Sequence, residues 1–337
     1  MNNETILDVE NLTVWYELEE ETVKAVNDIS FSLNRGETIG LVGETGAGKT
    51  TTALALLRLV PDPPGVIKSG KITVCGNDML QLPVQKLESI RGKDISMIFQ
   101  DPMTSLNPVF KVADQIAESL ELHEKLTKEQ AHKKALDMLE TVGIPRSRGS
   151  DYPHQFSGGM KQRVVIAIAL ACSPQLLIAD EPTTALDVTI QAQVLDLMKD
   201  LKDKHGTSVI MITHDLGIVA ETCDKVAVMY AGRIIEEGNL DDVFNHTLHP
   251  YTEGLFNSLP NINDRKADLK PIPGLMPDPT NLPEGCAFAP RCEYAVEACR
   301  TNLPPLKGIG AHRTACLRYD EDGFRIRRSI EREEQHV

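Results

Sequence analysis

The feature that constrains this sequence most is residues 43–51, which read Gly-Glu-Thr-Gly-Ala-Gly-Lys-Thr-Thr. The pattern G-x-x-x-x-G-K-[ST] is typical of a loop that wraps around a polyphosphate with its N–H groups turned inward. The glycines permit backbone angles and close approaches that a side chain would prevent. In such a loop Lys49 reaches the β- and γ-phosphates, and the Thr50 hydroxyl is offered to Mg²⁺.

The flanking residues place this loop between a strand and a helix. Residues 38–42 form a short apolar run that suits a buried strand. Residues 52–59 are rich in Ala and Leu, which favour a helix. A helix that begins at the loop presents unpaired N–H groups and the positive end of its dipole to an anion. We therefore expect an α/β nucleotide-binding domain rather than a chance glycine-rich turn.

Charge and hydropathy exclude several functions. The formal net charge is −14 over 337 residues, which argues against a surface that binds nucleic acid or an anionic membrane in bulk. No apolar run approaches the ~20 residues that span a bilayer, and residues 1–4 lack the pattern of a secretory signal. We expect a cytosolic chain whose seven cysteines form no disulfides.

Polar residues stand where three further apolar runs end: Gln100, Asp180 with Glu181, and His214. An Asp at such a strand end holds Mg²⁺ in phosphate-loop proteins. The adjacent Glu181 could polarise the attacking water as a general base. Gln100 suits a contact with a metal ion or water, and His214 suits a contact with a γ-phosphate. Taken alone, Gln100 would more often be a plain strand end and His214 a structural residue.

A second helix start, at Ser157-Gly158-Gly159, also offers free N–H groups and a hydroxyl to an anion. Two phosphate-binding helix starts with one nucleotide loop are odd for a monomer. They make sense if each site serves a different copy of the domain. As an isolated motif, Ser-Gly-Gly would more often be a simple N-cap.

The N-terminal residues predict a small antiparallel sheet. Residues 6–16 and 23–33 alternate as strands do, and an acidic stretch between them suits a solvated hairpin tip. Tyr16 ends the first strand, with Trp15 beside it on the other face. One of these rings could stack on a base, or both could pack within the sheet.

Residues 103–156 have a different sequence pattern, with helical periodicity and no strand pattern. Thr127 and Gln130 have the spacing of a capping box, in which each side chain bonds the other residue's backbone N–H. Gly143 and Pro145 end the helix that follows. We interpret 103–156 as a helical insert within the α/β domain.

Four cysteines gather near the C-terminus with the spacing C-x₅-C-x₆-C-x₁₆-C, at Cys286, Cys292, Cys299 and Cys316. Thiols gathered in a short, strand-poor segment suggest a structural metal site, because a bound metal can supply the folding energy that a small core lacks. Zinc usually has tight C-x₂₋₄-C pairs, which are missing here. An iron–sulfur cluster accepts four thiolates at irregular spacing. Four unligated thiols are the third interpretation.

Taken together, residues 6–260 resemble the nucleotide-binding domain of an ABC ATPase, with six of the family's motifs in order. The resemblance implies ATP contacts, in chain order, at Tyr16, Gly43, Glu44, Thr45, Gly46, Ala47, Gly48, Lys49, Thr50, Thr51, Gln100, Ser157, Gly158, Gly159, Met160, Asp180 and Asp187. It also implies that Thr50, Gln100 and Asp180 hold Mg²⁺. The catalytic groups would be Glu181, His214 and Lys49.

The C-terminal part resembles the ATPases of oligopeptide/dipeptide importers, a subfamily that includes nickel importers. The stretch His-Pro-Tyr-Thr at 249–252 and the motif Cys-x-Phe-x-Pro-Arg-Cys at 286–292 both match. In some relatives four cysteines hold a 4Fe–4S cluster, and the resemblance implies one at Cys286, Cys292, Cys299 and Cys316. The chain then divides into a P-loop ATPase domain, 1–260, and a Cys-rich extension, 261–337.

The resemblance also implies partners and a location. A second, related ATPase chain would pair head to tail with this one, so that each ATP lies between one chain's phosphate loop and the other's Ser-Gly-Gly signature. Two permease subunits would dock at the helical insert, on the cytoplasmic face of the cell membrane. An extracytoplasmic binding protein would deliver peptides, with nickel or another small solute as the alternative cargo.

ABC ATPases that act on ribosomes or DNA form a different class. Those of translation usually carry two ATPase domains in one chain, and those of repair insert long coiled coils before the signature. This chain has one phosphate loop, a compact insert and a net charge of −14. We therefore expect no nucleic-acid partner.

Overall fold

The computed structural model describes residues 4–184, 186–258, 271–309, 312–321 and 323–327. The predicted domain boundary at 260/261 and residue 185 lie outside the described residues. Within them, the chain folds into two β-sheets surrounded by helices, which agrees with the predicted α/β class.

The first sheet is antiparallel and contains the predicted N-terminal hairpin. Its four described strands, in spatial order, are β2 (Thr22–Asn34), β1 (Thr5–Glu17), β4 (Gly65–Val74) and β5 (Asn77–Asp78). Leu7 pairs with Leu33 and Tyr16 pairs with Val23, so the hairpin closes at its acidic tip. Shifts of register along β1 mark bulges, which add local twist.

The second sheet carries the phosphate loop. Its eight described strands, in spatial order, are β11 (Lys307–Ile309), β12 (His312–Thr314), β10 (Arg233–Asn239), β9 (Lys225–Tyr230), β3 (Thr38–Val42), β8 (Ser208–Thr213), β7 (Leu176–Asp180) and β6 (Ile95–Ile98). The five strands from β9 to β6 run parallel to one another. The other three, β10, β12 and β11, each pair antiparallel with the neighbouring strand. The C-terminal strands β11 and β12 thus extend the sheet of the ATPase domain.

The parallel strands are buried on both faces. In β7, Leu176 and Ile178 belong to one apolar cluster, and Leu177 and Ala179 belong to the other. This alternation follows from the period of two residues in a strand. Because both faces are covered, these strands read as continuous apolar runs in the sequence.

Helices cover both faces of this sheet and form the insert. The described α-helices are α1 (Lys49–Leu56), α2 (Val84–Ile90), α3 (Pro102–Ser105), α4 (Val112–Glu124), α5 (Lys128–Thr141), α6 (Gly158–Leu170), α7 (Val188–His205), α8 (Leu216–Thr222), α9 (Leu240–Asn245), α10 (Pro250–Asn257) and α11 (Glu297–Thr301). Short 3₁₀ turns are η1 (Arg146–Ser150), η2 (Pro153–Gln155), η3 (Ala289–Arg291) and η4 (Leu317–Asp320).

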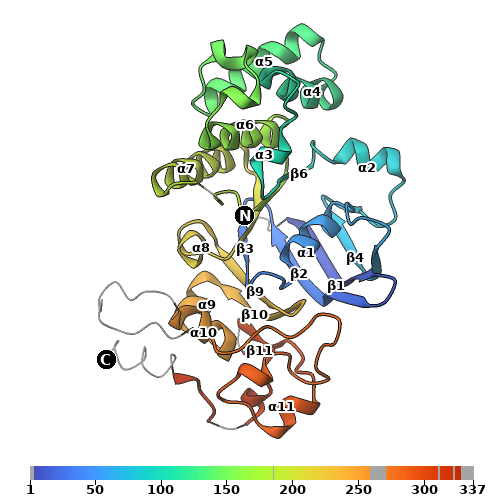
Figure 1. Ribbon diagram of the computed structural model, residues 1–337, viewed down its shortest axis with the longest axis vertical. Coiled ribbons are helices and arrows are strands. Elements are labelled where there is room, and N and C mark those ends of the chain that lie inside the picture. Colours follow the sequence, from blue (N-terminus) through green and yellow to red (C-terminus); the bar gives the residue numbers. More distant parts are fainter. Residues whose placement is uncertain (1–3, 185, 259–270, 310–311, 322, 328–337) are drawn as a thin grey trace.

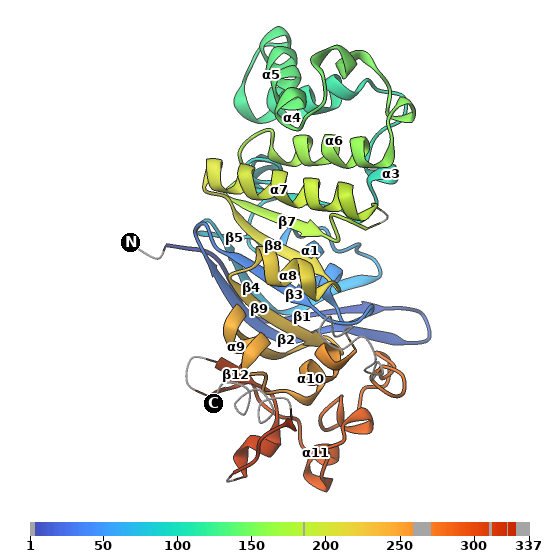
Figure 2. The same cartoon turned by 90° about the vertical axis from the view of Figure 1, so that its left-hand side faces the viewer.

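The segment 103–156 is helical, as predicted, and α4 packs against α5. The predicted capping box is confirmed: Gln130 N–H donates to the Thr127 hydroxyl at 3.3 Å, and Thr127 N–H donates to the Gln130 amide oxygen at 3.0 Å. The α4–α5 pair lies at one end of the long axis and the C-terminal region lies at the other (Figure 1). Figure 2 shows α6 and α7 side by side between that pair and the sheet.

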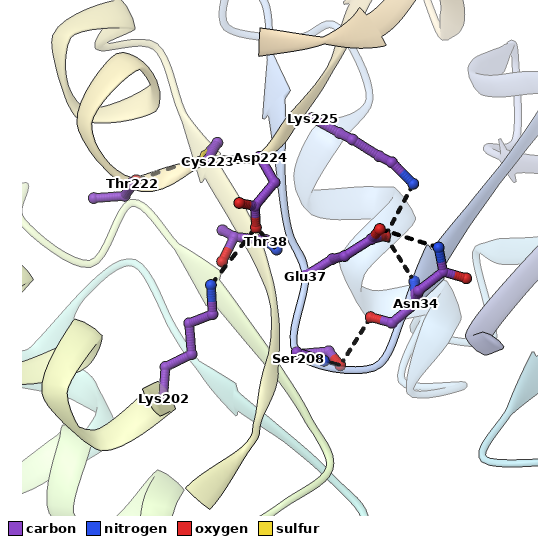
Figure 3. Close-up of polar contacts among 10 residues, drawn as sticks. Asn34, Glu37, Thr38, Lys202, Ser208, Thr222, Cys223, Asp224 and Lys225 are labelled. Atoms are coloured by element: carbon purple, nitrogen blue, oxygen red, sulfur yellow. Dashed lines mark hydrogen bonds and ion pairs between the residues drawn. The ribbon is translucent and has the colours of Figure 1, made fainter. Parts of the chain in front are cut away.

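Hydrogen bonds and ion pairs connect the amino ends of the central strands (Figure 3). Lys225 donates to Glu37 at 2.9 Å, and the Thr38 N–H donates to Asp224 at 2.7 Å. Lys202, near the end of α7, pairs with Asp224 at 3.6 Å. Because the strands are parallel, their carboxyl ends all meet at the opposite edge of the sheet, where the phosphate loop begins.

Candidate functional site

The phosphate loop joins β3 to α1, as the sequence predicts, and its glycines are needed sterically. A Cβ atom added at Gly43 would lie 2.2 Å from the Met229 carbonyl oxygen. A Cβ atom added at Gly48, whose φ is +99°, would lie 2.3 Å from the Ala25 carbonyl oxygen. The loop therefore lies against β2 and β9 so closely that only glycine fits at these positions.

Lys49 is the first residue of α1, and its ammonium turns back over the loop. Its Nζ donates to the carbonyl oxygens of Gly43 at 2.7 Å and of Glu44 at 3.0 Å. Burial lowers the pKa of Lys49, against the attraction of Glu181, Asp180 and Glu44. An ammonium held over the phosphate loop is suited to bind phosphate oxygens.

Asp180 ends β7, directly beside the start of α1. It is 1% exposed and forms a side-chain hydrogen bond with Thr50. Burial raises its pKa, with Glu181 adding to the rise and with Thr50 and Lys49 opposing it. A carboxylate and a hydroxyl side by side are oxygen donors of the kind that Mg²⁺ prefers, so this pair fits the predicted metal contact.

Glu181 is the centre of a hydrogen-bonded group at the carboxyl edge of the sheet. His214 Nδ1 lies 2.9 Å from its Oε1, and Gln100 Nε2 donates to its Oε2 at 2.8 Å. Thr184 Oγ1 donates to the same Oε2 at 2.9 Å. Burial alone would raise the pKa of Glu181, but these bonds outweigh it and hold the pKa below its ordinary value. The group is thus held as a carboxylate.

The structure therefore brings together the polar ends of β6, β7 and β8. Glu181 also has a positive φ of +46°, which is uncommon for a non-glycine residue and turns the chain sharply after β7. Gln100 and His214 are exposed, whereas the Glu181 side chain is 13% exposed. A water molecule could reach the carboxylate from the exposed side.

Tyr16 is the ring of the N-terminal pair that lies near the phosphate loop. Its hydroxyl is 3.3 Å from the Thr51 hydroxyl in α1. Trp15 turns elsewhere: its Nε1 donates to Asn27 at 3.0 Å, and the Lys24 and Lys68 ammonium groups each lie 5.6 Å from its ring centroid. Of the two rings, Tyr16 is the one that contacts α1.

The Ser-Gly-Gly signature lies on a separate surface. Ser157 is the N-cap of α6 and accepts a hydrogen bond from Met160 N–H at 3.4 Å. Ser157 and Gly158 are exposed, and nothing lies within 4 Å of a Cβ atom added at Gly158. The signature lines a hollow of about 450 Å³ together with Asp187, which caps α7. The lining of the hollow includes no residue of the phosphate loop, so the signature and the loop lie on separate surfaces of the chain.

Two residues that hold Glu44 have no local signal in the sequence. The Arg291 guanidinium pairs with both Glu44 carboxylate oxygens, at 2.8 and 3.0 Å. The Tyr251 hydroxyl accepts a hydrogen bond from the Glu44 N–H at 2.9 Å. Both residues lie in the C-terminal motifs, at positions where the sequence offered only a resemblance, and no local pattern connects residues more than 200 positions apart.

The four C-terminal thiols lie in one partly buried region, in which Cys299 is buried and the other three are intermediate in exposure. Burial raises the pKa of Cys286, raises that of Cys292 to about 11 and raises that of Cys316 to about 12. The other thiols of the set, including Cys299, raise these values further through like-charge repulsion. Within the described residues, no three or more metal-ligating side chains are close enough to hold an ion. The thiols are therefore gathered without forming a coordination shell, and the predicted cluster is not demonstrated.

Comparison with known proteins gives the family. Residues 26–184 match the family model described as ABC transporter, and residues 235–299 match the model described as oligopeptide/dipeptide transporter, C-terminal region. The chain is 49% identical to the oligopeptide transport ATP-binding protein AppD of Bacillus subtilis, over 95% of this chain and 98% of that protein. The chain belongs to the ABC transporter ATP-binding proteins.

Further relatives and solved structures agree with this family. The oligopeptide transport ATP-binding protein OppD of Salmonella typhimurium is 49% identical over 94% of this chain and 95% of its own length. The dimeric ATP-binding cassette MJ0796, bound to ADP and phosphate, has a TM-score of 0.63 at 26% identity and covers 69% of this chain and 98% of its own. CbiO1 from Clostridium perfringens, part of a transporter complex, has a TM-score of 0.60 at 30% identity and covers 72% and 91%.

This ABC protein is therefore an ATPase with the P-loop cassette fold, and it hydrolyses ATP as a transporter subunit. Among the described residues, no helix has the length and the apolar character needed to cross a bilayer.

Proposed function

We propose that this chain powers the uptake of oligopeptides or dipeptides through separate permease subunits. The observation that supports this most strongly is that relatives named for peptide import match both parts of the chain at 47–52% identity, including the C-terminal region at 235–299. The chain itself need not touch the cargo, so the cargo is inferred from the relatives.

ATP would enter with its phosphates in the loop at 43–51. The Lys49 ammonium, which now bonds to the Gly43 and Glu44 carbonyl oxygens, is within reach of β- and γ-phosphate oxygens that enter the loop. The N–H groups at the start of α1 would receive the phosphates along the helix dipole. The Tyr16 ring would stack on the base.

Thr50, Asp180 and Gln100 would hold Mg²⁺, which neutralises charge that develops on the phosphate oxygens. Glu181 would take a proton from the attacking water, because its lowered pKa keeps it ionised at neutral pH. His214 would orient Glu181 and contact the γ-phosphate. In the present structure His214 and Gln100 bond to Glu181, and both exposed side chains could turn toward a bound nucleotide.

The signature would act on the ATP of a second ATPase chain. Ser157 and Gly158 are exposed at the start of α6, and their hollow contains no residue of this chain's own phosphate loop. A head-to-tail pair would bring each signature, with Asp187 beside it, onto the partner's nucleotide. We expect that partner to be a related but distinct chain.

The membrane partners would be two permease subunits and an extracytoplasmic binding protein. The chain would then lie on the cytoplasmic side of the cell membrane as a peripheral subunit. The insert carries exposed apolar side chains at Val109, Phe110 and Leu122, with exposed fractions of 72%, 55% and 71%, and this supports docking there.

A 4Fe–4S cluster at Cys286, Cys292, Cys299 and Cys316 is the finer part of this proposal, with zinc as the alternative. Four partly or fully buried thiols that act electrostatically on one another support it. Ligation would require deprotonation of these thiols and a local closing of the shell. Protein purified without oxygen should be brown and contain about four iron atoms per chain. Stoichiometric zinc without iron would contradict the cluster.

Uptake assays test the cargo. A strain that lacks this chain should lose the uptake of labelled di- and oligopeptides and regain it with the wild-type chain, but not with the variant Glu181→Gln. Unchanged peptide uptake together with lost nickel uptake would replace peptides with nickel as the cargo. Unchanged uptake of both would refute the proposal for these solutes.

A further inference from the structure

Glu44, the second residue of the phosphate loop, is held from outside the ATPase motifs. Arg291 Nη1 donates to its Oε2 at 2.8 Å, and Nη2 donates to its Oε1 at 3.0 Å. This two-point pairing fixes the carboxylate in direction as well as in position. The Tyr251 hydroxyl, in α10, accepts from the Glu44 N–H at 2.9 Å. The loop is thus bound to the C-terminal region through both the side chain and the backbone of one residue.

Arg291 is itself fixed by its surroundings. Its side chain is 6% exposed, and its Nε donates to the Pro273 carbonyl oxygen at 2.9 Å. Nη1 is also 3.3 Å from the Tyr230 hydroxyl, and the guanidinium carbon lies 6.0 Å from the Phe288 ring centroid. A buried guanidinium whose donors are in hydrogen bonds has little freedom to move. Arg291 therefore holds the Glu44 carboxylate in one position.

The same residue also bonds to Lys49. The Glu44 carbonyl oxygen accepts from Lys49 Nζ at 3.0 Å, so one residue links the C-terminal region to the ammonium that binds phosphate. A second contact points the same way: a Cβ atom added at Gly46 would lie 3.0 Å from Met276 Cε, in the segment that follows Pro273. The C-terminal region thus supports the loop at two positions.

We propose that Arg291 is a positioning residue for ATP: together, Arg291 and Tyr251 fix the side chain and the backbone N–H of Glu44, so that the phosphate loop is held in its nucleotide-binding shape before ATP arrives. The C-terminal region then contributes to the ATP site and is not only an extension of the ATPase domain. A loop held in advance loses less conformational entropy on binding, so the pair acts on nucleotide affinity. This inference depends on the ATPase site alone and not on which solute is imported.

The test measures the dissociation constant of Mg-ATP for the full-length chain, together with thermal unfolding without nucleotide. Arg291→Met should weaken binding by at least about tenfold, because it removes a charged, two-point hydrogen bond from the loop. Arg313→Met is the matched control, since Arg313 lies in the same C-terminal region and pairs with Glu237 of β10 at 2.6 Å. It should lower stability and leave ATP affinity within about twofold of wild type.

The ion pair can also be removed from its other end. Glu44→Gln should weaken Mg-ATP binding in the same way, and the double variant with Arg291→Met should be no weaker than the worse single variant, which shows that the two act as one unit. Arg291→Lys should recover only part of the affinity, because an ammonium cannot pair at two points.

Two results would overturn the inference. One is an Mg-ATP affinity of Arg291→Met that stays within twofold of wild type. If Arg291→Met does not fold, the same result with Glu44→Gln counts instead. The other is an equal loss of affinity in Arg291→Met and Arg313→Met at equal loss of stability. Either result would mean that Arg291 stabilises the fold and does not influence the phosphate loop.

Discussion

His249 allows a quantitative test of how α10, which carries Tyr251, is held against the phosphate loop. Its side chain is 1% exposed, and its Nδ1 accepts from the Tyr251 N–H at 3.0 Å as the N-cap of α10. Burial lowers the pKa of His249 from 6.5 to about 3, against a hydrogen bond with the Ala315 backbone. The ring is therefore neutral in the folded chain throughout the physiological range.

The direction of the pH effect follows from this shift. Because the folded pKa is below the unfolded one, the unfolded chain takes up a proton below pH 6.5 that the folded chain does not. Stability is thus lost as the pH falls from 6.5 toward 3, at about 1.4 kcal/mol per pH unit. Between pH 7 and pH 5 this single residue should remove about 2 kcal/mol from the free energy of unfolding.

The assay compares the wild-type chain with His249→Asn by urea unfolding at pH 7 and pH 5. Asparagine is a good N-cap and keeps an acceptor near the position of Nδ1, but it does not titrate. The variant should be less stable at pH 7, because it loses buried ring volume. Its stability should nevertheless fall by about 2 kcal/mol less than that of wild type between the two pH values. Other titrating groups are common to both chains and cancel in the difference.

Equal pH dependence in the two chains would refute the reasoning. So would a ring-proton NMR signal of His249 that titrates near pH 6.5 in the folded protein. Either result would mean that the ring is hydrated or paired in solution, and that the N-cap of α10 is not held by a neutral, buried imidazole.

Three further predictions concern the ATPase site and the insert. Glu181→Gln should lower ATP turnover by about 10²–10⁴-fold and keep Mg-ATP binding, and a full rate with the partner's sites disabled would exclude Glu181 as the base. Gly48→Ala should abolish nucleotide binding, because its Cβ atom would lie 2.3 Å from the Ala25 carbonyl oxygen; Gly76→Ala, with φ of +76° and open space around it, should leave binding intact. Thr127→Ala should cost about 1 kcal/mol of stability by removing the capping box, and no change in thermal unfolding would show that this helix start is held by other contacts.

Local chemistry made much of this protein predictable. The sequence around Gly43–Lys49 requires a strand, a tight loop and a helix, and the structure has β3, the loop and α1 at those positions. The apolar runs before Gln100, Asp180 and His214 are strands β6, β7 and β8. Parallel strands align their carboxyl ends, so a correct strand assignment already implied that the polar ends would meet.

Other features could not be predicted, because they depend on contacts between distant segments. The sequence did not show that β11 and β12 would pair into the ATPase sheet through β10, or that Arg291 would reach Glu44. The four C-terminal cysteines suggested a metal site, and among the described residues no group of three or more metal-ligating side chains is found.

The sequence by itself determined the ATPase fold and the position of the phosphate loop, because a phosphate loop dictates its own glycines, lysine and flanking elements within a few residues. Only the tertiary structure decided how the C-terminal region meets that loop. The Arg291–Glu44 pair joins residues 247 positions apart, and such a contact depends on how the turn η3 packs against the loop that follows β3. No periodicity or motif encodes that separation, so it had to be seen in three dimensions.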